Sequence, residues 1–359
     1  MLRHVGWRRI CIINVALTIP LRVAQHYSGS VIDVMPLGNG HINDTYFVNT
    51  ESRSFVLQRI NKNVFPNPEQ ITLNLMALNK HASEADVCDI SLKIPELLLT
   101  ENGRNFFQDE QDNYWRALSF IENTESIESI SHISEAKQVG TALGRFHRLT
   151  RTLEIKKLQD TLPGFHICPD YLQHYLEVEK STAVPKNSFC ADFIDKFQDI
   201  ANDLEHAESQ GLLSMRVIHG DPKLNNFLFD KDSQCVISLI DLDTVKPGLI
   251  HYDIGDCIRS CCHTTGTDAF NLDICQELLA SYLKEMGEYL STYDYQFIYP
   301  AIRLIPFELG LRFYTDYLVG NRYFKVTEPD ENLNRAIAQF RLCSNVMEHE
   351  DEIKKFVMT

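Results

Sequence analysis

The sequence has no excess of positive charge, no cysteine framework and no long apolar run. Its 34 Lys and Arg residues are outnumbered by 49 Asp and Glu residues, giving a formal net charge of -15. This argues against a nucleic-acid partner, because no basic face is available to replace phosphate counterions. No run approaches the roughly 20 apolar residues that a membrane-spanning helix needs. The composition, with 44% hydrophobic and 23% charged residues over 359 positions, is that of a globular protein large enough for two lobes.

The ten cysteines are scattered along the chain without a disulfide framework. Cys257, Cys261 and Cys262 precede His263, but this spacing does not match a structural zinc site, and no second pair with ligand spacing follows. We interpret them as reduced thiols on a helix, which predicts a cytoplasmic protein.

Residues 1–22 form an N-terminal extension to which the sequence assigns no role. The basic stretch Met1–Arg9 and the mostly apolar stretch Ile10–Leu21 superficially fit a signal peptide. Asn14 and Pro20 interrupt the apolar stretch, and no small-residue cleavage site follows. A start codon placed too early and a short packed extension fit equally well. The oligomeric state is not indicated by any pattern.

What the chain does contain is the loop His219–Asn226, delivered by a short apolar strand at 216–218. Asp221 can orient a hydroxyl nucleophile and accept its proton, and Lys223 can neutralise charge on a phosphate. Asn226 offers a neutral oxygen suited to Mg²⁺. Asn225 is chemically equivalent, and Asn226 is preferred because its spacing from Asp221 matches kinase-fold enzymes. The residues predict phosphoryl transfer from ATP with Mg²⁺.

A second loop follows the first through a predicted hairpin. Residues 228–229 and 236–240 read as strands around a turn at 230–233, which brings Asp241 close to Asn226. Asp243 then points the same way as Asp241 along the strand, because side chains alternate along a strand. Asp241 and Asp243 are therefore predicted to complete a metal site with Asn226.

The N-terminal third predicts a small sheet with one helix, and a further helix follows it. Gly38–Asp44 is a tight turn whose glycines let backbone N–H groups approach phosphate oxygens. A polar hinge at 122–131 precedes a helix at 134–149, with Ser134 as N-cap and His147 as a structural residue. The expected strands cover 31–37, 45–48, 54–60, 94–99, 105–107 and 114–121, and the first helix covers 68–81.

Several segments together resemble the aminoglycoside phosphotransferase-like small-molecule kinases, and within them the branch of the N-acetylhexosamine 1-kinases. These segments are Gly38–Tyr46, Leu57–Asn61, His219–Asn226, Ile240–Gly248, Tyr252–Asp256 and Arg312–Leu318. The resemblance implies a two-lobed protein-kinase-like α+β fold. Residues 23–122 would form an antiparallel-sheet, nucleotide-binding lobe, and residues 123–359 a larger, mainly helical lobe for catalysis and acceptor binding. Gly220 departs from the branch, which often carries asparagine there.

The resemblance also implies where ATP and the acceptor bind. On the third strand, the lysine of protein kinases is absent, and Gln58 and Arg59 both remain candidates for contacting phosphate. Asp253 and Asp256 are expected to brace the metal loop, with Arg259 as an ion-pair partner. The implied nucleotide-binding residues are Gly38, Gly40, Asn43, Arg59, Phe120 and Glu122. Among the residues of the acceptor segment, Arg303, Arg312, Asp316 and Tyr317, the selected substrate residues are Arg303 and Tyr317.

The implied reaction is phosphorylation of the anomeric hydroxyl of an amino sugar, N-acetylglucosamine or N-acetylgalactosamine. An amino alcohol such as choline or homoserine, or an aminoglycoside, is the alternative acceptor, and carboxylates clustered around the cleft would favour these cations. A non-catalytic kinase-fold binding protein is disfavoured because Asp221, Asn226 and Asp241 are all present. Protein substrates are disfavoured because no A-P-E signature follows Asp241.

Overall fold

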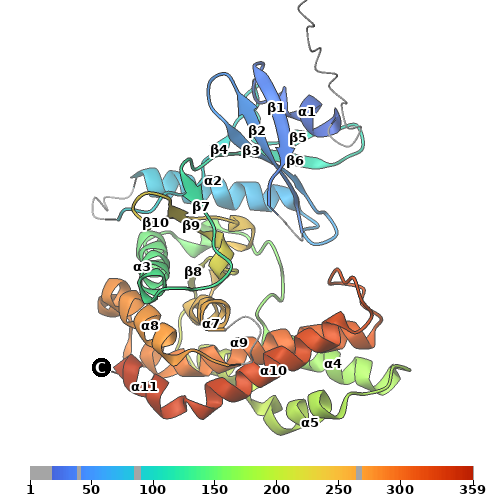
Figure 1. The fold of residues 1–359 in the computed structure, drawn as a ribbon, viewed down its shortest axis with the longest axis vertical. Helices are drawn as coiled ribbons and strands as arrows, with labels where there is room; N and C mark the ends of the chain where they lie inside the picture. Colours follow the sequence, from blue (N-terminus) through green and yellow to red (C-terminus); the bar gives the residue numbers. More distant parts are fainter. Residues whose placement is uncertain (1–17, 39–41, 85–89, 264–268, 359) are drawn as a thin grey trace, which may run out of the picture. The chain divides into compact units, whose positions relative to one another are not determined.

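The computed structural model describes residues 18–38, 42–84, 90–263 and 269–358. Contacts divide the chain into two compact units. One contains the described residues up to Pro68 together with Glu96–Phe120, and the other contains Glu69–Pro95 and Ile121 onward. The first is built on an antiparallel sheet and the second is mainly helical, as expected from the sequence (Figure 1). Gly40 and most of the N-terminal extension lie outside the described residues.

The sheet of the first unit has the strand order β1-β2-β3-β6-β4, with β5 pairing to β6. Antiparallel pairing of β3 with β6 sets Gln58 opposite Arg116 and Arg59 opposite Trp115. The expected strands at 94–99 and 105–107 are only two residues long. The bounds are β1 Val31–Pro36, β2 Asp44–Thr50, β3 Phe55–Ile60, β4 Leu97–Leu98, β5 Phe107–Gln108 and β6 Tyr114–Ser119.

One face of this sheet carries the core of the unit. Phe55, Leu57, Trp115 and Ala117 alternate onto it along β3 and β6 and pack with α1 (Thr18–Ala24). Helix α1 crosses residue 23, the expected start of the first lobe, so the end of the N-terminal extension belongs to this packed unit.

Helix α2 (Pro68–Glu84) groups with the second unit rather than with the sheet that precedes it. The side chain of Asn74 is fully buried, and its amide nitrogen donates to the carbonyl oxygens of Gln159 and Val245, both at 2.8 Å. Its amide oxygen accepts from the Gln159 backbone at 2.8 Å. A ring nitrogen of His81 lies 2.9 Å from the Leu149 carbonyl oxygen. These bonds fix α2 to the second unit, whereas the sequence placed it in the first lobe.

The core of the second unit forms between α9 and the helices packed on it, α4, α7 and α10 (Figure 1). Leu304, Phe307 and Leu311 of α9 are fully buried, as their helical spacing predicts. No helix among the described residues combines the length and apolar character needed to cross a membrane. The helix bounds are α3 Ile133–Thr150, α4 Cys168–Ser181, α5 Ser188–Phe197, α6 Asp203–Ser209, α7 Ile250–Cys261, α8 Leu272–Met286, α9 Thr292–Leu318, α10 Glu331–Glu348 and α11 Glu350–Met358.

Helix α3 begins at Ile133 with His132 as its N-cap, two residues before the predicted N-cap, Ser134. The reason is Glu135, whose carboxylate accepts from the backbone N–H groups of Ser131 at 2.7 Å and His132 at 3.1 Å. Within α3, Gly144 allows close packing on α8, because a Cβ there would lie 2.7 Å from the Cβ of Glu285.

Two short sheets hold the loops of interest. β8 (Arg216–Ile218) pairs with β11 (Lys246–Gly248), and β9 (Phe227–Asp230) lies between β10 (Val236–Leu239) and β7 (Thr124–Glu125). The hairpin of β9 and β10 is as predicted. The strand does not continue to Asp243, because Asp241 has a left-handed backbone with φ 65° and Leu242–Thr244 form a 3₁₀ turn. Strand alternation therefore does not relate Asp241 to Asp243.

Candidate active site

The loop after β8 makes a turn that only glycine fits at its second residue. Gly220 has φ 87°, and a Cβ there would lie 2.7 Å from the Thr244 carbonyl oxygen. The Thr244 hydroxyl donates to the His219 carbonyl at 2.8 Å. The loop that carries Asp221 is thus in direct contact with the loop that carries Asp241.

Asp253 of α7 supports this loop through its backbone. Its buried carboxylate accepts from the N–H groups of His219 at 2.7 Å and Gly220 at 2.8 Å. His147 lies 2.9 Å from the same carboxylate, which confirms its structural role. Burial alone would raise the pKa of Asp253, but the contacts to His147 and His219 together outweigh it and lower the pKa. Asp253 therefore braces the catalytic loop, not the metal loop as the sequence suggested.

His219 joins the same two loops from the other side. Burial lowers its pKa, so the ring is neutral. With its Nε2–H it donates to the Ile240 carbonyl at 3.0 Å, and its Nδ1 accepts from the Asp221 backbone N–H at 3.2 Å. The backbone N–H of Ile240 in turn donates to the Asn226 carbonyl at 2.9 Å. Hydrogen bonds through the His219 ring and the Ile240 backbone therefore connect Asp221 with Asn226.

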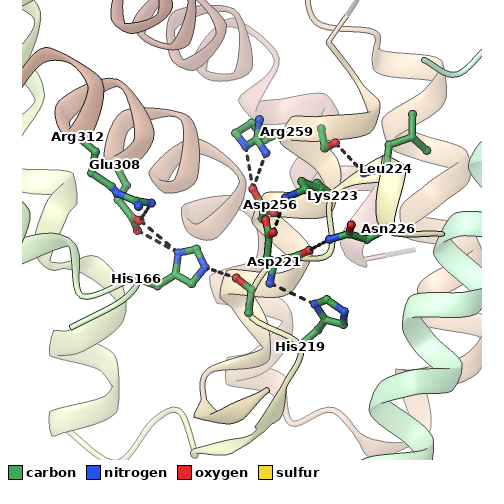
Figure 2. Close-up of polar contacts among 12 residues, drawn as sticks. His166, His219, Asp221, Lys223, Leu224, Asn226, Asp256, Arg259, Glu308 and Arg312 are labelled. Carbon is green, nitrogen blue, oxygen red and sulfur yellow. Dashed lines mark hydrogen bonds and ion pairs between the residues drawn. The ribbon is translucent and has the colours of Figure 1, made fainter. Parts of the chain in front are cut away.

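The carboxylate of Asp221 is paired with Lys223, whose Nζ lies 2.6 Å away (Figure 2). Both side chains are partly exposed, at 27% and 35%. Burial would lower the pKa of Lys223, but the charges of Asp221 and Asp241 raise it further than burial lowers it. Lys223 therefore stays positively charged beside Asp221, whose carboxylate could accept a proton.

The side chains proposed for metal binding differ in exposure. Asn226 is buried and donates through Nδ2 to the Asp221 carbonyl at 2.8 Å, so its oxygen, the atom that can bind a cation, is turned away from that carbonyl. Asp241 is exposed, whereas Asp243 is 2% exposed. The described residues contain no group of three or more His, Cys, Asp and Glu side chains arranged to hold a metal. An amide oxygen with one or two carboxylates fits Mg²⁺, which retains waters and phosphate oxygens as further ligands.

Helix α7 adds a second carboxylate behind the catalytic loop. Arg259 lies 2.7 Å from Asp256, which confirms the predicted ion pair, and Figure 2 shows both beside Lys223 and Asp221. The other carboxylate oxygen of Asp256 is buried and accepts no hydrogen bond from the described chain. The hydroxyl of Ser260 accepts from the Leu224 N–H at 2.8 Å and fixes the loop further along.

Among the residues implied in nucleotide binding, Asn43 and Arg59 contact other residues of the first unit, whereas Gly38 does not pack closely. Gly38 lies two residues after the end of β1, with φ 69° and open surroundings. The side chain of Asn43 accepts from the Asn61 N–H at 3.0 Å. Arg59 forms an ion pair with Asp44, and its guanidinium lies 5.9 Å from the Trp115 ring centroid. Arg59 is therefore on the face of the sheet that carries the core.

The opposite face of the sheet carries a different cation. Gln58 accepts from the guanidinium of Arg116 at 2.8 and 3.0 Å. Phe120, the residue after β6 and four positions from Arg116, stacks edge-on against Phe47, with 4.8 Å between ring centroids. Glu122 is exposed in the second unit. Gln58, Arg116 and Phe120 thus share a face that Arg59 does not.

A cavity of about 340 Å³ lies within the second unit, large enough for a small molecule. Its central charged group is Arg312, whose guanidinium lies 5.1 Å from the ring centroids of Phe165 and Tyr171 and 5.6 Å from that of Phe324. Asp316 also lines the cavity, but its carboxylate accepts four hydrogen bonds from within the chain. The cavity therefore presents cations and apolar groups rather than available carboxylates.

The two substrate residues selected from the sequence do not line this cavity. Arg303 is nine residues before Arg312, about two and a half helical turns, and so faces the opposite side of α9. It pairs there with Asp203 at 2.6 Å. Tyr317 packs against the hydrophobic core of the unit.

Sequence reasoning did not select Arg116, Arg312 or His166, which contacts the catalytic loop. Arg116 could have been found only from the β3–β6 register, which no turn signal fixes. Arg312 lies on the segment that resembles an acceptor region, and its spacing from Thr315, Asp316 and Val319 is that of one helix face. His166 has no local motif.

Three solved structures are similar to this chain over almost its whole length. The microcompartment-associated aminopropanol kinase has a TM-score of 0.68 at 17% identity, covering 94% of this chain and 98% of that chain. The aminoglycoside phosphotransferase from Alicyclobacillus acidocaldarius has 0.63 at 15%, with 94% and 96% covered. Amicoumacin kinase, in complex with AMP-PNP and Ca²⁺, has 0.60 at 15%, with 93% of each chain covered. At these identities the likeness shows the fold, which is the predicted one.

The sequence model of the phosphotransferase enzyme family, APH, matches residues 33–290. This match spans well over half of the chain and includes both loops that meet at His219 and Ile240. It agrees with the family expected from the motifs. The chain therefore belongs to the phosphotransferase enzyme family.

Proposed function

We propose that this protein transfers the γ-phosphoryl group of ATP to the anomeric hydroxyl of an N-acetylhexosamine, N-acetylglucosamine or N-acetylgalactosamine. The observation that carries the phosphoryl-transfer part is the pair of Asp221 and Lys223, held by backbone hydrogen bonds beside Asn226 and the Asp241 loop. ATP and Mg²⁺ are the expected cofactors, and the need for ATP supports a cytoplasmic location.

In the proposed reaction, Asp221 accepts the proton of the acceptor hydroxyl as its oxygen attacks the γ-phosphorus. The new bond joins that oxygen to phosphorus, the bond to the β-phosphate oxygen breaks, and ADP leaves with the electron pair. Lys223 moves its hydrogen bonds from Asp221 to the γ-phosphate oxygens. Asn226, Asp241 and Asp243 would hold Mg²⁺, which would supply charge neutralisation for the phosphates.

For the nucleotide, we propose that Gly38, Gly40 and Asn43 shape the phosphate turn and that Phe120 and Glu122 border the adenine. The sequence leaves both Gln58 and Arg59 as candidates for the phosphate contact. The ion pair of Arg59 with Asp44 and its place over Trp115 favour Gln58 and Arg116 instead. The supporting observation is that these two share a face with Phe120.

For the acceptor, we propose the cavity around Arg312. Three of the rings that line the cavity and could receive an ammonium group, those of Phe165, Tyr171 and Phe324, already contact the Arg312 guanidinium. A guanidinium only donates hydrogen bonds, so it suits sugar hydroxyls and an acetyl carbonyl. Leu162, Pro163 and Val319 offer apolar contact for a methyl group. Charge therefore favours a neutral N-acetyl sugar over a cationic amino alcohol or aminoglycoside.

The alternative acceptor is an amino alcohol, which the similarity to an aminopropanol kinase favours. ADP release from ATP-Mg²⁺ should be measured with N-acetylglucosamine, N-acetylgalactosamine, glucosamine, choline, homoserine and 1-amino-2-propanol. The methyl glycoside of N-acetylglucosamine is the matched control, because its anomeric oxygen carries no proton. We expect turnover with the free N-acetyl sugars and none with the glycoside. A higher kcat/KM for choline, homoserine or 1-amino-2-propanol would refute the sugar assignment, and a higher value for glucosamine would refute the N-acetyl group as the recognised feature.

A further inference from the structure

The segment between residue 159 and α4 forms one wall of the cavity and is tied to the metal loop. Lys246 is buried, and its Nζ donates to the Asp160 carboxylate at 3.0 Å and the Leu162 carbonyl at 3.2 Å. The Thr161 hydroxyl donates to the Asp243 carbonyl at 2.7 Å. The segment ends at His166, which is 3% exposed and has φ 70°.

His166 lies between two groups that only accept hydrogen bonds. Its Nε2 is 2.8 Å from the Gly220 carbonyl oxygen, and its Nδ1 is 3.2 Å from the Glu308 carboxylate (Figure 2). Because neither a carbonyl nor a carboxylate can donate, both ring nitrogens carry protons. The geometry therefore requires an imidazolium.

The charged groups around the ring agree with this protonation state. On α9, Glu308 is 1% exposed and also lies 3.6 Å from Arg312. On α7, Tyr252 stacks on the ring at 5.2 Å, its hydroxyl bonded to Glu205 of α6, and Asp256 adds a negative charge. Burial alone would lower the pKa of His166, but Glu308, Asp256 and the Gly220 carbonyl together outweigh burial and raise it.

The Gly220 carbonyl belongs to the same rigid peptide plane as the Asp221 N–H. The carbonyl accepts from His166 and the N–H donates to His219, so two histidines clamp this plane from both sides. Together with the φ rotation of Asp221, this plane sets the direction in which the Asp221 side chain leaves the backbone.

We propose that His166 is a positioning residue, held as an imidazolium between Glu308 and Gly220, that fixes the orientation of Asp221 and links it to Arg312 in the cavity. The proposal rests on the proposed function for its kinetic readout, but not for its structural one. The link runs from Arg312 through Glu308 and His166 to the peptide before Asp221.

The pH dependence of this contact follows from the raised pKa of His166 in the folded protein. The ion pair with Glu308 is fully present below the ordinary pKa of about 6.5 and is lost as pH rises through the higher, folded value. Above that value the neutral ring has one N–H for two acceptors, and the carboxylate, the stronger acceptor, keeps it, so that a lone pair faces the Gly220 carbonyl. We expect kcat to fall on the alkaline side, with little change in the acceptor KM.

Two amide variants separate the two contacts of the ring. His166→Gln places its NH₂ near the Nε2 position and keeps a donor for Gly220, whereas His166→Asn places it near the Nδ1 position and keeps only the donor for Glu308. Asparagine tolerates the left-handed backbone better than glutamine, so strain alone would favour the Asn variant. We expect His166→Asn to lower kcat about tenfold, corresponding to about 1.4 kcal/mol, and His166→Gln to lower it less and to remove the alkaline limb.

Hydrogen exchange of the Asp221 amide, followed at one pH in the peptide that covers 216–224, tests the proposal without an acceptor. Faster exchange in His166→Asn than in the wild type and His166→Gln is the expected result. Equal exchange in all three proteins, or an unchanged alkaline limb in His166→Gln, would overturn the proposal. A wild type inactive on every sugar, with the expected exchange pattern, would refute only the proposed function.

Discussion

The residues around Asp221 act mainly on its backbone. Asp253 accepts from the backbone N–H groups of His219 and Gly220, the two residues before Asp221. The His219 ring accepts from the backbone N–H of Asp221, and His166 contacts the Gly220 carbonyl. A side chain held by its backbone needs no direct contact to be oriented, so the Asp221 carboxylate remains available for Lys223 and for an acceptor. The same arrangement makes the loop sensitive to substitution at Gly220.

We expect Gly220→Ala to destabilise the fold and to lower kcat. A left-handed backbone costs a non-glycine residue about 1–2 kcal/mol, and here the new Cβ would also lie 2.7 Å from the Thr244 carbonyl oxygen. Gly211→Ala is the matched control, because Gly211 has φ 70° in the same unit with no atom within 4 Å of its would-be Cβ. Chemical denaturation should show the larger loss for Gly220→Ala, and kcat should fall only there. Equal losses of stability with unchanged kcat would contradict the steric account.

Single-residue predictions from the sequence succeeded where a role depends on local order. The spacing of the His219–Asn226 loop and the hairpin to Ile240 gave two loops that the structure joins, and the Asp256–Arg259 pair followed from their separation on one helix. Residues whose position depends on distant packing were not found. Arg116 reaches its face through strand register, and His166 meets Gly220 across 54 positions of sequence.

Helix α9 organises the cavity through its C-terminal turns. Asp316, one turn after Arg312, accepts from the backbone N–H groups of Arg322, Tyr323 and Phe324 at 2.8 to 3.0 Å. It also accepts from Asn332 of α10 at 2.9 Å. One carboxylate thus folds the segment that brings Phe324 over the Arg312 guanidinium.

Asp316→Asn should therefore weaken acceptor binding without affecting ATP. An amide would set its NH₂ against backbone N–H groups and release the segment from α9. We expect the acceptor KM to rise about tenfold, or about 1.4 kcal/mol, with the KM for ATP unchanged. Asp351→Asn, at an exposed position of α11, is the control. If both KM values rose together, Asp316 would have a general structural role instead.

The elements themselves were largely predictable, and their ends were not. Helices at 134–149 and 68–81 have strong apolar periodicity, and the structure shows both within a few residues. The strand expected to reach Asp243 ends at Leu239, because the sequence gives no sign of the left-handed residue at Asp241. The placement of α2 with the second unit depends on Asn74, a buried amide bonded to segments far along the chain.

Over the whole molecule, the two compact units divide the proposed roles. The first unit carries Gly38 and Phe120 on an antiparallel sheet, and the second carries Asp221, Asn226 and the Arg312 cavity. The family match spans parts of both units. The reaction class follows from the family and the catalytic loops, and the proposed identity of the acceptor is inferred from the charge of one cavity.

The most direct test of the central claim is the phosphorus NMR spectrum of the product formed from ATP-Mg²⁺ and N-acetylglucosamine, recorded for the wild type and Asp221→Asn. The wild type should give a sugar 1-phosphate signal split by the anomeric proton. Asp221→Asn should form the same product about 10²- to 10⁴-fold more slowly, the usual contribution of a general base. A phosphate on another hydroxyl, no product, or an Asp221→Asn rate equal to that of the wild type would contradict the account.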